Sequence, residues 1–430
     1  MSAIDGWTRK FPGHWGTKPL KAVASYMVSN VDKVPADNEL PVRLCNYTDV
    51  YNNEFISTAM DLMRTTATAT EIEKFRLLKN DVVITKDSES WDDIAIPSLI
   101  VDTADDLLCG YHLAILRPKP EEINGRFLFR CLQSKSIRLQ LELSSTGVTR
   151  FGLPKGEIGK MLLPVTSLSA QQRIANYLDR ETSQIDTLIK EKKRMLALLE
   201  EKRAVLISQA TTRGLNPDAS LKPSGYSWLG DIPAHWKVKR SKQVLKERDE
   251  RSLTGDEELL TVSHITGVTK RSEKQVYMFE AETNEGYKRC SSGNLVINTL
   301  WAWMGAMGIA WEAGIVSPAY HVYELSSELL PGYVDALVRM PVFAKEVTRF
   351  SKGVWSSRLR LYPEGLYEVR LPVPPLEEQQ QIIDAIASER QQTAEMETAL
   401  NKSIGLLKER RSALITAAVT GQIEPEAMNP

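Results

Sequence analysis

The sequence predicts an α+β fold in which two mixed α/β domains, in a pseudo-twofold arrangement, are separated by a long antiparallel two-helix coiled coil. Three observations predict it. The 430-residue chain repeats itself at long range, each repeat begins with short apolar runs, and each ends in a long heptad pattern. At roughly 150 residues per domain, the length also indicates more than one hydrophobic core.

The internal duplication is collinear along the chain. Six segments of the first half match six of the second in the same order, with offsets that drift from 221 to 206. The pairs are FPGHW with IPAHW, NDVVIT with GNLVIN, GYHLAIL with AYHVYEL, STGV with SKGV, LPVTSLSAQQRI with LPVPPLEEQQQI, and LLEEKRAVLI with LLKERRSALI. A period of about 200 residues is far longer than any solenoid repeat, so the pattern indicates a duplicated module pair. The middles agree poorly, which predicts a shared frame with diverged centres.

The domain organisation follows from this order of segments. Short Val/Ile/Leu runs broken by loops are typical of mixed α/β domains. Polar, Pro-rich NPDASLKPSG reads as a linker. The predicted segments are a first domain at 1–165, a first long helix at 166–215, a linker and start of the second repeat at 216–236, a second domain at 237–372, a second long helix at 373–422, and a C-terminal tail at 423–430.

Both long helices have start and stop signals. Ser167 or Ser169 can cap the first helix, and the pair Pro374-Pro375 sets the entry of the second. Gly214 and Gly421 stand at the C-terminal ends, where glycine is favoured. About 40 residues at ~1.5 Å each make helices about 60 Å long.

A heptad seam runs along each predicted helix, flawed by Lys192 and Thr393. A single amphipathic helix against its own domain would also show such a stripe, but a pair of packed helices explains why both halves carry it. The predicted seam is Ile174, Leu178, Ile185, Leu188, Met195, Leu199 and Leu206 in the first helix, and Ile382, Ile386, Met396, Leu400, Leu407 and Leu414 in the second.

Composition excludes several classes of protein. No window approaches ~18 consecutive apolar residues, and the N-terminus does not read as a secretory signal, so we expect no membrane association. Four cysteines lie far apart without a CxxC pair, which fits a reducing cytoplasm. Because 54 Lys and Arg balance 55 Asp and Glu, any nucleic-acid surface must be focal.

The chain shows no catalytic motif that occurs in both halves. It has no GxxxxGK[ST] phosphate loop, no HExxH, and five histidines without metal spacing. His14 and His235 each stand between Pro and Trp, which indicates a packed aromatic corner. We therefore expect a recognition protein with no catalytic site, metal or cofactor of its own.

The order of these segments resembles HsdS, the specificity subunit of type I restriction–modification systems. The resemblance covers essentially the whole chain, and its most specific motifs are SWLGDIPAHW, PPLEEQQ and EKRAVLISQATTRGL. The first helix entry departs from the pattern, with Thr166-Ser167 in place of the Pro-Pro pair.

The resemblance implies a non-catalytic subunit for phage defence. Its two target-recognition domains would each read half of a bipartite, asymmetric site in double-stranded DNA. Two HsdM methyltransferase subunits would dock on the frame, and HsdR restriction subunits would join for cleavage. S-adenosylmethionine and ATP with Mg²⁺ would belong to those partners, which carry DNA methylation and cleavage.

Candidate DNA-contacting residues follow the matched STGV and SKGV segments. Arginine reads guanine bidentately, and hydroxyl groups bind phosphate or base edges. Solvated loop ends or salt bridges within the domain are the alternative. Trp301 could stack on bases, although packing of Trp301 and Trp303 in the core is the commoner role. The candidates are Thr149, Arg150, Ser356, Ser357, Arg358, Arg360 and Trp301.

Three other functions stay open from the sequence. A specificity subunit of another phage-defence assembly would look the same. A coiled-coil scaffold without DNA binding would show no salt-dependent DNA affinity. An unrecognised hydrolase is disfavoured because no constellation of carboxylate, Cys or Ser residues appears in both halves.

Overall fold

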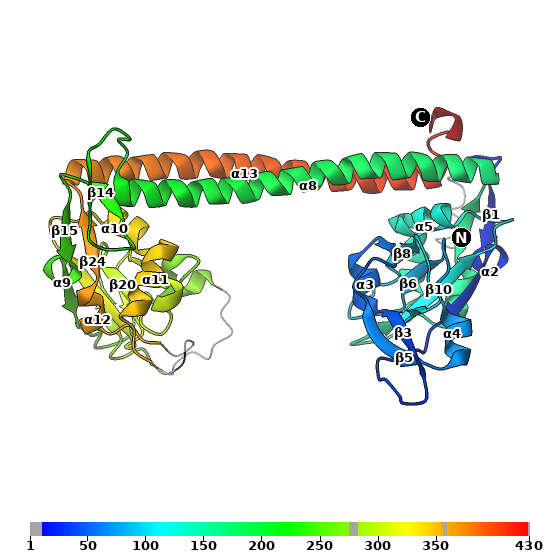
Figure 1. The fold of residues 1–430 in the computed structure, drawn as a ribbon, viewed down its shortest axis with the longest axis horizontal. Helices are drawn as coiled ribbons and strands as arrows, with labels where there is room; N and C mark the ends of the chain where they lie inside the picture. The colour runs from blue at the N-terminus through cyan, green and yellow to red at the C-terminus, as the bar shows by residue number, and fades with distance from the viewer. Residues whose placement is uncertain (1–10, 275–282, 354, 356–358, 429–430) are drawn as a thin grey trace. The chain divides into compact units, whose positions relative to one another are not determined.

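The computed structural model describes residues 11–274, 283–353, 355 and 359–428, which lie in two compact units. Unit 1 comprises Met1–Lys192 with Asn401–Pro430, and unit 2 comprises Lys193–Leu400. Each unit contains a mixed α/β domain and one end of each long helix, α8 (Leu168–Arg213) and α13 (Leu376–Val419) (Figure 1). The predicted class, with two α/β domains and two long helices, is confirmed.

In each unit, the first and last strands of the α/β domain pair with each other in the same way. In unit 1, β1 (Gly16–Pro19) pairs antiparallel with β12 (Leu162–Val165), which leads into α8. In unit 2, β15 (Lys237–Arg240) pairs antiparallel with β24 (Arg370–Val373), which leads into α13. In both, the first residue of the N-terminal strand lies opposite the last residue of its partner.

A central antiparallel sheet follows, with the same strand order in each unit. The orders β2-β10-β6 and β16-β23-β20 correspond, and NDVVIT and GNLVIN form the equivalent inner strands. The duplication is therefore confirmed at the level of topology. The shared elements are α2 (Leu20–Val23), β2 (Ala24–Val28), β6 (Val82–Thr85) and β10 (Leu113–Pro118) in unit 1, and α9 (Ser241–Val244), β16 (Leu245–Arg248), β20 (Leu295–Asn298) and β23 (Tyr320–Leu325) in unit 2.

The middles of the two units differ. Both central sheets continue with a strand antiparallel to the inner strand, β8 (Pro97–Ile100) in unit 1 and β21 (Met307–Ile309) in unit 2. Unit 1 then adds β4 and a second sheet, β5-β3-β9, whereas unit 2 adds the pairs β17–β18 and β19–β22. The remaining elements are β3 (Leu40–Cys45), α3 (Tyr47–Asn52), β4 (Phe55–Ile56), β5 (Met63–Ala67), α4 (Ala69–Phe75), β7 (Asp87–Ser88), β9 (Leu107–Cys109), β11 (Phe151–Gly152), β13 (Leu221–Pro223), β14 (Asp231–Pro233), β17 (Leu260–Ser263), β18 (Gly267–Lys270), η1 (Arg271–Glu273), β19 (Lys288–Cys290), η2 (Ala302–Met304), β22 (Gly314–Val316) and η4 (Pro425–Met428).

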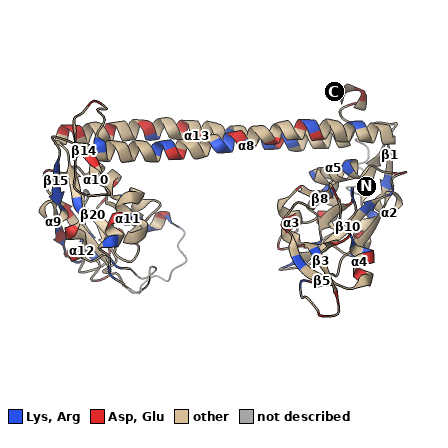
Figure 2. Cartoon of the chain, viewed as in Figure 1, with Lys and Arg blue, Asp and Glu red and all other residues tan. Residues whose placement is uncertain are grey.

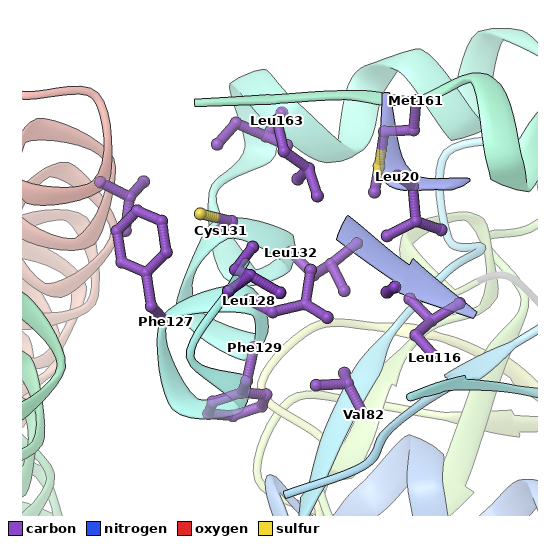
Figure 3. Packing of buried hydrophobic residues seen from close by; sticks show 14 of the residues in the cluster. Leu20, Val82, Leu116, Phe127, Leu128, Phe129, Cys131, Leu132, Met161 and Leu163 are labelled. Atoms are coloured by element: carbon purple, nitrogen blue, oxygen red, sulfur yellow. The ribbon is translucent and has the colours of Figure 1, made fainter. Parts of the chain in front are cut away.

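Three short helices precede the strand that leads into the long helix in each unit. In unit 1, Leu128 and Leu132 of α5 pack in one buried cluster with Leu20, Val82 and Leu116 (Figure 3). The helices are α5 (Gly125–Gln133), α6 (Lys135–Leu143) and α7 (Lys155–Lys160) in unit 1, and α10 (Pro331–Val338), α11 (Pro341–Arg349) and α12 (Pro363–Glu368) in unit 2.

A buried glutamine joins each domain to the start of its long helix. Gln171 accepts a hydrogen bond from the Asn124 amide (2.8 Å) and donates to the carbonyl of Thr166 (2.8 Å). Gln379 likewise accepts from the Leu330 amide (2.8 Å) and donates to the Pro374 carbonyl (2.9 Å). Both glutamines are fully buried, so these bonds satisfy backbone groups that water cannot reach.

A glycine and an aromatic corner end each long helix. Gly214 (φ +76°) follows α8 beside Trp236, and a Cβ on this glycine would lie 3.3 Å from the indole. Gly421 (φ +74°) follows α13, where a Cβ would lie 2.6 Å from Pro12 and 3.2 Å from Trp15. The Pro and Trp residues of the repeated Pro-x-His-Trp segments thus form a packed corner, whereas His14 and His235, which the prediction placed in it, are exposed. Each domain holds the start of one helix and the end of the other, so within each unit the helices run antiparallel.

The predicted heptad seam is shifted at three positions. Ile174, Leu178, Ile185, Ile382 and Ile386 are buried, as predicted. The prediction was wrong for three residues, whose exposed fractions are 51% for Leu188, 51% for Met195 and 54% for Met396. Ile189 and Leu196 are half-buried one residue further along α8, and Thr393, considered a flaw, is buried. The half-buried remainder of the predicted seam is Leu199, Leu206, Leu400, Leu407 and Leu414.

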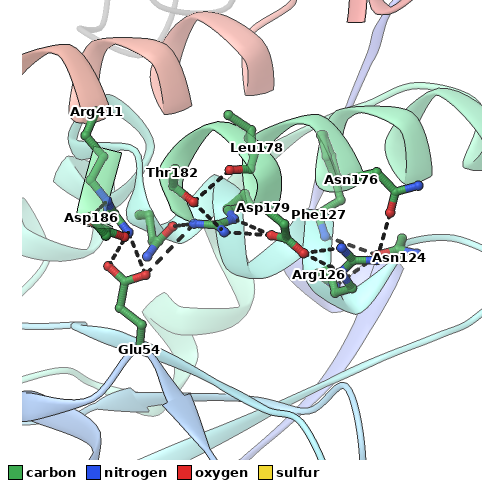
Figure 4. A network of polar contacts seen from close by, with 12 residues as sticks. Glu54, Asn124, Arg126, Phe127, Asn176, Leu178, Asp179, Thr182, Asp186 and Arg411 are labelled. Carbon is green, nitrogen blue, oxygen red and sulfur yellow. Dashed lines mark hydrogen bonds and ion pairs between the residues drawn. The ribbon is translucent and has the colours of Figure 1, made fainter. Parts of the chain in front are cut away.

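An ionic network fastens the unit 1 domain to both helices (Figure 4). The buried guanidinium of Arg130 on α5 donates to Asp179 (2.6 Å) and Thr182 (3.1 Å) of α8. Arg411 of α13 donates to Glu54 (2.7 Å) and Asp186 (2.9 Å). Removing one partner of such a buried pair would strand a charge away from water.

Replacing the buried glutamine should destabilise the junction of domain and helix. Gln171→Ala removes the bonds to Asn124 and Thr166, and we expect the free energy of unfolding to fall by about 1–3 kcal/mol. Urea denaturation followed by circular dichroism measures this loss. Gln184→Ala, at an exposed position of the same helix, is the control. Equal losses in the two variants would contradict the role of Gln171.

Candidate nucleic-acid interface

Loop A, residues 146–152, lies between α6 and α7 and is closed by its own backbone. Thr146 and Gly152 exchange two amide-to-carbonyl hydrogen bonds, of 3.0 and 2.9 Å. Gly147 has φ +147°, and a Cβ there would lie 2.0 Å from the Arg150 carbonyl oxygen. Only glycine fits this turn, so the loop has one defined shape.

Loop B, residues 352–360, occupies the equivalent place in unit 2. Lys352 and Arg360 exchange two backbone hydrogen bonds, each of 2.9 Å, between α11 and α12. The residue after each loop is anchored in the same way. The Leu153 amide donates to the Lys86 carbonyl (2.9 Å), and the Leu361 amide donates to that of Thr299 (3.2 Å). Both carbonyls directly follow the matched inner strands, so the two loops are structurally equivalent.

Both loops lie in stretches without acidic residues. Residues 144–156 contain Arg150 and Lys155 but no Asp or Glu, and residues 350–363 contain three cations and again no acid. The carboxylate of Asp87, on β7 beside loop A, is already paired with Lys86 (2.9 Å) and with His112. In a chain of nearly zero net charge, these are focal surfaces suited to a polyanion.

The predicted side chains on the two loops point to solvent where the structure describes them. Thr149, Arg150 and Arg360 are exposed, and their side chains make no hydrogen bond or ion pair with a described residue. The alternative that these arginines form salt bridges within the domain therefore has no support among the described residues. Ser356, Ser357 and Arg358 lie outside the described residues.

Trp301 is 49% exposed, so the alternative of core packing is wrong for this residue. Its ring is stacked with that of Trp303, with centroids 6.4 Å apart. Trp301 lines a cleft of about 980 Å³ in unit 2, together with Arg271, Lys274 and Tyr320. Thr299, which anchors loop B, lies in the chain between Asn298 and Leu300, two residues that line the cleft.

Polar groups in this cleft are held in place by hydrogen bonds. The side-chain amide of Asn298 donates to the Tyr320 hydroxyl (3.0 Å), and Lys274 donates to Thr266 (2.6 Å). Burial raises the pKa of Tyr320, so its hydroxyl keeps its proton at neutral pH. Burial lowers the pKa of Lys274. Such a cleft offers a flat aromatic ring beside cationic and hydrogen-bonding groups.

Val148 and Trp91 are among the exposed apolar side chains of unit 1 that sequence reasoning missed. Val148, in loop A, is 91% exposed, and Trp91, three residues after β7, is 45% exposed. The signal for Trp91 was present, because Trp91 and Trp301 both follow the repeated inner strand. No signal marked Val148, since valine is usually buried.

The described part of the chain offers neither a cluster of metal ligands nor an exposed thiol. No cluster of three or more His, Cys, Asp or Glu that could hold a metal occurs there. All four cysteines are buried, and burial raises the pKa of each thiol, to about 11 for Cys290. None of the helices described has the length and hydropathy to cross a membrane.

Comparison with known proteins finds similarity to type I restriction–modification specificity subunits. The family model of the type I restriction modification DNA specificity domain matches residues 15–197. A type I restriction enzyme specificity subunit, MjaX of Methanocaldococcus jannaschii, is 24% identical over 169 residues, 39% of this chain and 38% of that protein. The EcoBI specificity subunit of Escherichia coli is 22% identical over 346 residues, 75% of this chain and 71% of that protein. Residues 15–197 therefore match a type I restriction modification DNA specificity domain.

Solved structures of this kind share the fold. A chain from a structure on complex assembly and conformational transition of the type I R-M system has a TM-score of 0.65 at 16% identity, with 96% of this chain and 99% of that chain covered. The HsdS subunit of Thermoanaerobacter tengcongensis has a TM-score of 0.53 at 17% identity, with coverage of 96% and 98%.

The family match includes loop A. Residues 15–197 extend from the start of β1 into α8, so the specificity domain contains the whole α/β domain of unit 1. Unit 2 repeats the same frame with a different middle. Whether Thr149, Arg150, Arg360 and Trp301 contact DNA stays a prediction.

Proposed function

We propose that this chain is the DNA specificity subunit of a type I restriction–modification complex and binds a bipartite, asymmetric site in double-stranded DNA. The observation that carries the proposal is the pair of loops A and B. They are closed by equivalent backbone bonds and free of acidic residues, and loop A lies in the matched specificity domain. A cationic loop of defined shape can approach phosphates and present side chains to base edges.

Two different half-sites follow from the two different middles. Loop A presents Val148, Thr149 and Arg150, whereas loop B presents Trp355 and Arg360 and is two residues longer between its bridge residues. Different side chains on the same frame read different bases. The proposed site is therefore asymmetric although the frame is duplicated.

The long helices offer equivalent surfaces for two identical partners. Besides the seam, α8 carries an exposed apolar stripe of Leu188, Met195, Leu198 and Val205, spaced by seven, three and seven residues. This heptad spacing places the four residues on one helix face. At an offset of 208 residues, α13 carries Met396, Ser403, Leu406 and Ala413. Met396 and Leu406 are 54% and 56% exposed, although Lys, Arg, Asp and Glu are interspersed along both helices (Figure 2).

We assign these stripes to two HsdM methyltransferase subunits, one on each helix. HsdR restriction subunits would then join the assembly for DNA cleavage, in the cytoplasm. S-adenosylmethionine and ATP with Mg²⁺ would be bound by these partners, which carry out methylation and cleavage. This chain would supply the choice of site.

Sequencing of methylated bases in the host genome, with and without this gene, tests the proposal. Methylation at one bipartite motif that disappears with the gene is expected. A coiled-coil scaffold without DNA binding would leave the methylation pattern unchanged. It would also add no salt-dependent DNA affinity to the complex with its methyltransferase.

Removing one loop arginine should weaken binding at one half-site only. If Arg150 reads a base, Arg150→Ala costs about 1–3 kcal/mol of binding free energy on duplexes with the intact first half-site. It should change nothing at the second. Fluorescence anisotropy of the complex on both duplex series measures this effect. Arg64→Ala, another exposed arginine of unit 1, controls for the lost charge. Equal weakening on every duplex would assign Arg150 to a phosphate instead.

A charge placed on one stripe should release one partner. Leu198→Asp on α8 or Leu406→Asp on α13 puts a carboxylate into the proposed apolar contact, and each should lower the bound methyltransferase from two copies to one. The double variant should bind none. Native mass spectrometry counts the copies, and Ala197→Asp, on another exposed face of α8, should keep both. Two copies on the double variant would place the docking surface elsewhere.

A further inference from the structure

Val148 has an exposure that packing within unit 1 does not explain. At 91%, it is the most exposed of the large apolar side chains in the described residues. Its position is imposed by the fold, because the bonds between Thr146 and Gly152 close the loop and Gly147 admits no side chain. A fixed backbone therefore holds an isopropyl group in water.

The surroundings of Val148 indicate what covers it. Its neighbours Thr149 and Arg150 offer a hydroxyl and a guanidinium without partners among the described residues, and residues 144–156 contain no acid. A DNA major groove matches this combination of groups, since phosphates and base edges accept hydrogen bonds there. The apolar group that a base edge presents in this groove is the C5 methyl of thymine.

We propose that Val148 reads a thymine methyl group in the first half-site. This inference rests on the proposed function and adds a specificity determinant to it. Contact between the isopropyl group and the methyl group removes both from water, which favours binding to thymine. An uncharged side chain of this kind would leave phosphate contacts unaffected.

The geometry of loop A also places this thymine. Val148 and Arg150 are two residues apart, and even an extended chain spans only about 7 Å over that distance. Base pairs are stacked about 3.4 Å apart. The thymine should therefore lie within about three base pairs of a guanine read by Arg150.

Loop B carries an apolar side chain of its own. Trp355 lies between the bridge residues Lys352 and Arg360 and is 68% exposed. An exposed apolar group thus recurs in the equivalent loop, with a size and shape unlike those of valine. This difference agrees with two half-sites of different sequence.

A uracil scan tests the inference directly. The bipartite site is first read from host methylation, and each thymine of its first half-site is then replaced by deoxyuridine, which lacks only the C5 methyl. For the wild-type chain in complex with its methyltransferase, one replacement should weaken binding about fourfold, the value of one buried methyl group. Val148→Ala should lose about as much on the thymine duplex and nothing further on that uracil duplex.

The matched control is Val34→Ala. Val34 is 71% exposed in the same unit, in a stretch that contains Asp32 and Asp37 and is therefore unsuited to a polyanion. This variant should respond to uracil as the wild type does. Because Val148 has almost no contacts to lose, circular dichroism should show both variants folded.

Four results would overturn the inference. A first half-site without thymine, a flat uracil scan, or an undiminished response of Val148→Ala each excludes the methyl contact. Loss of bound methyltransferase in Val148→Ala would instead make Val148 a protein contact. If the wild-type complex shows no sequence-specific binding at all, the proposed function fails first, and the scan separates the two failures.

Discussion

Each unit depends on one α/β domain holding the start of one long helix and the end of the other. At the start, a buried glutamine satisfies backbone groups of both domain and helix. At the end, a glycine in the left-handed region lets Trp15 or Trp236 pack against the last turn. The aromatic corner of the first repeat packs against the end of α13, the helix of the second repeat. Unit 1 is therefore built from both repeats.

This constraint explains which parts of the fold could be predicted from the sequence. Segments at the helix ends must fit the same partner twice, so they agree between the halves and reveal the duplication. The helices themselves were predicted from their heptads and from their start and stop signals. The intervening seam positions were not, because Leu188 and Met195 are as apolar as Ile189 and Leu196, which lie one residue further along α8. Leu188, Met195 and Met396 then filled a neighbouring heptad position that belongs to the exposed stripes.

Burial was the quantity that sequence patterns could not supply at the candidate site. Arg130 reads as an ordinary surface arginine, yet it is buried and donates a hydrogen bond to Asp179. Val148 reads as an ordinary core residue, yet it is exposed. For Trp301, the sequence allowed both a buried and an exposed side chain. In each case the side chain's environment is set by residues distant in sequence, so local pattern gives no warning. The matched STGV and SKGV segments did locate both loops, because the frame on either side of them repeats.

The energetic separation of frame and loops has a functional consequence. Loop A is closed by backbone hydrogen bonds and by the turn at Gly147, so its shape depends little on the side chains of Val148, Thr149 and Arg150. Val148, Thr149 and Arg150 are exposed, and substitutions there remove few contacts within the protein, in contrast to substitutions at Gln171 or Arg130. Side chains in the loops can therefore change while the frame, and the helix faces proposed for the partners, stay intact. On the proposed function, new DNA sites could arise at low cost in stability, and the two halves could diverge in what they read while binding identical partners.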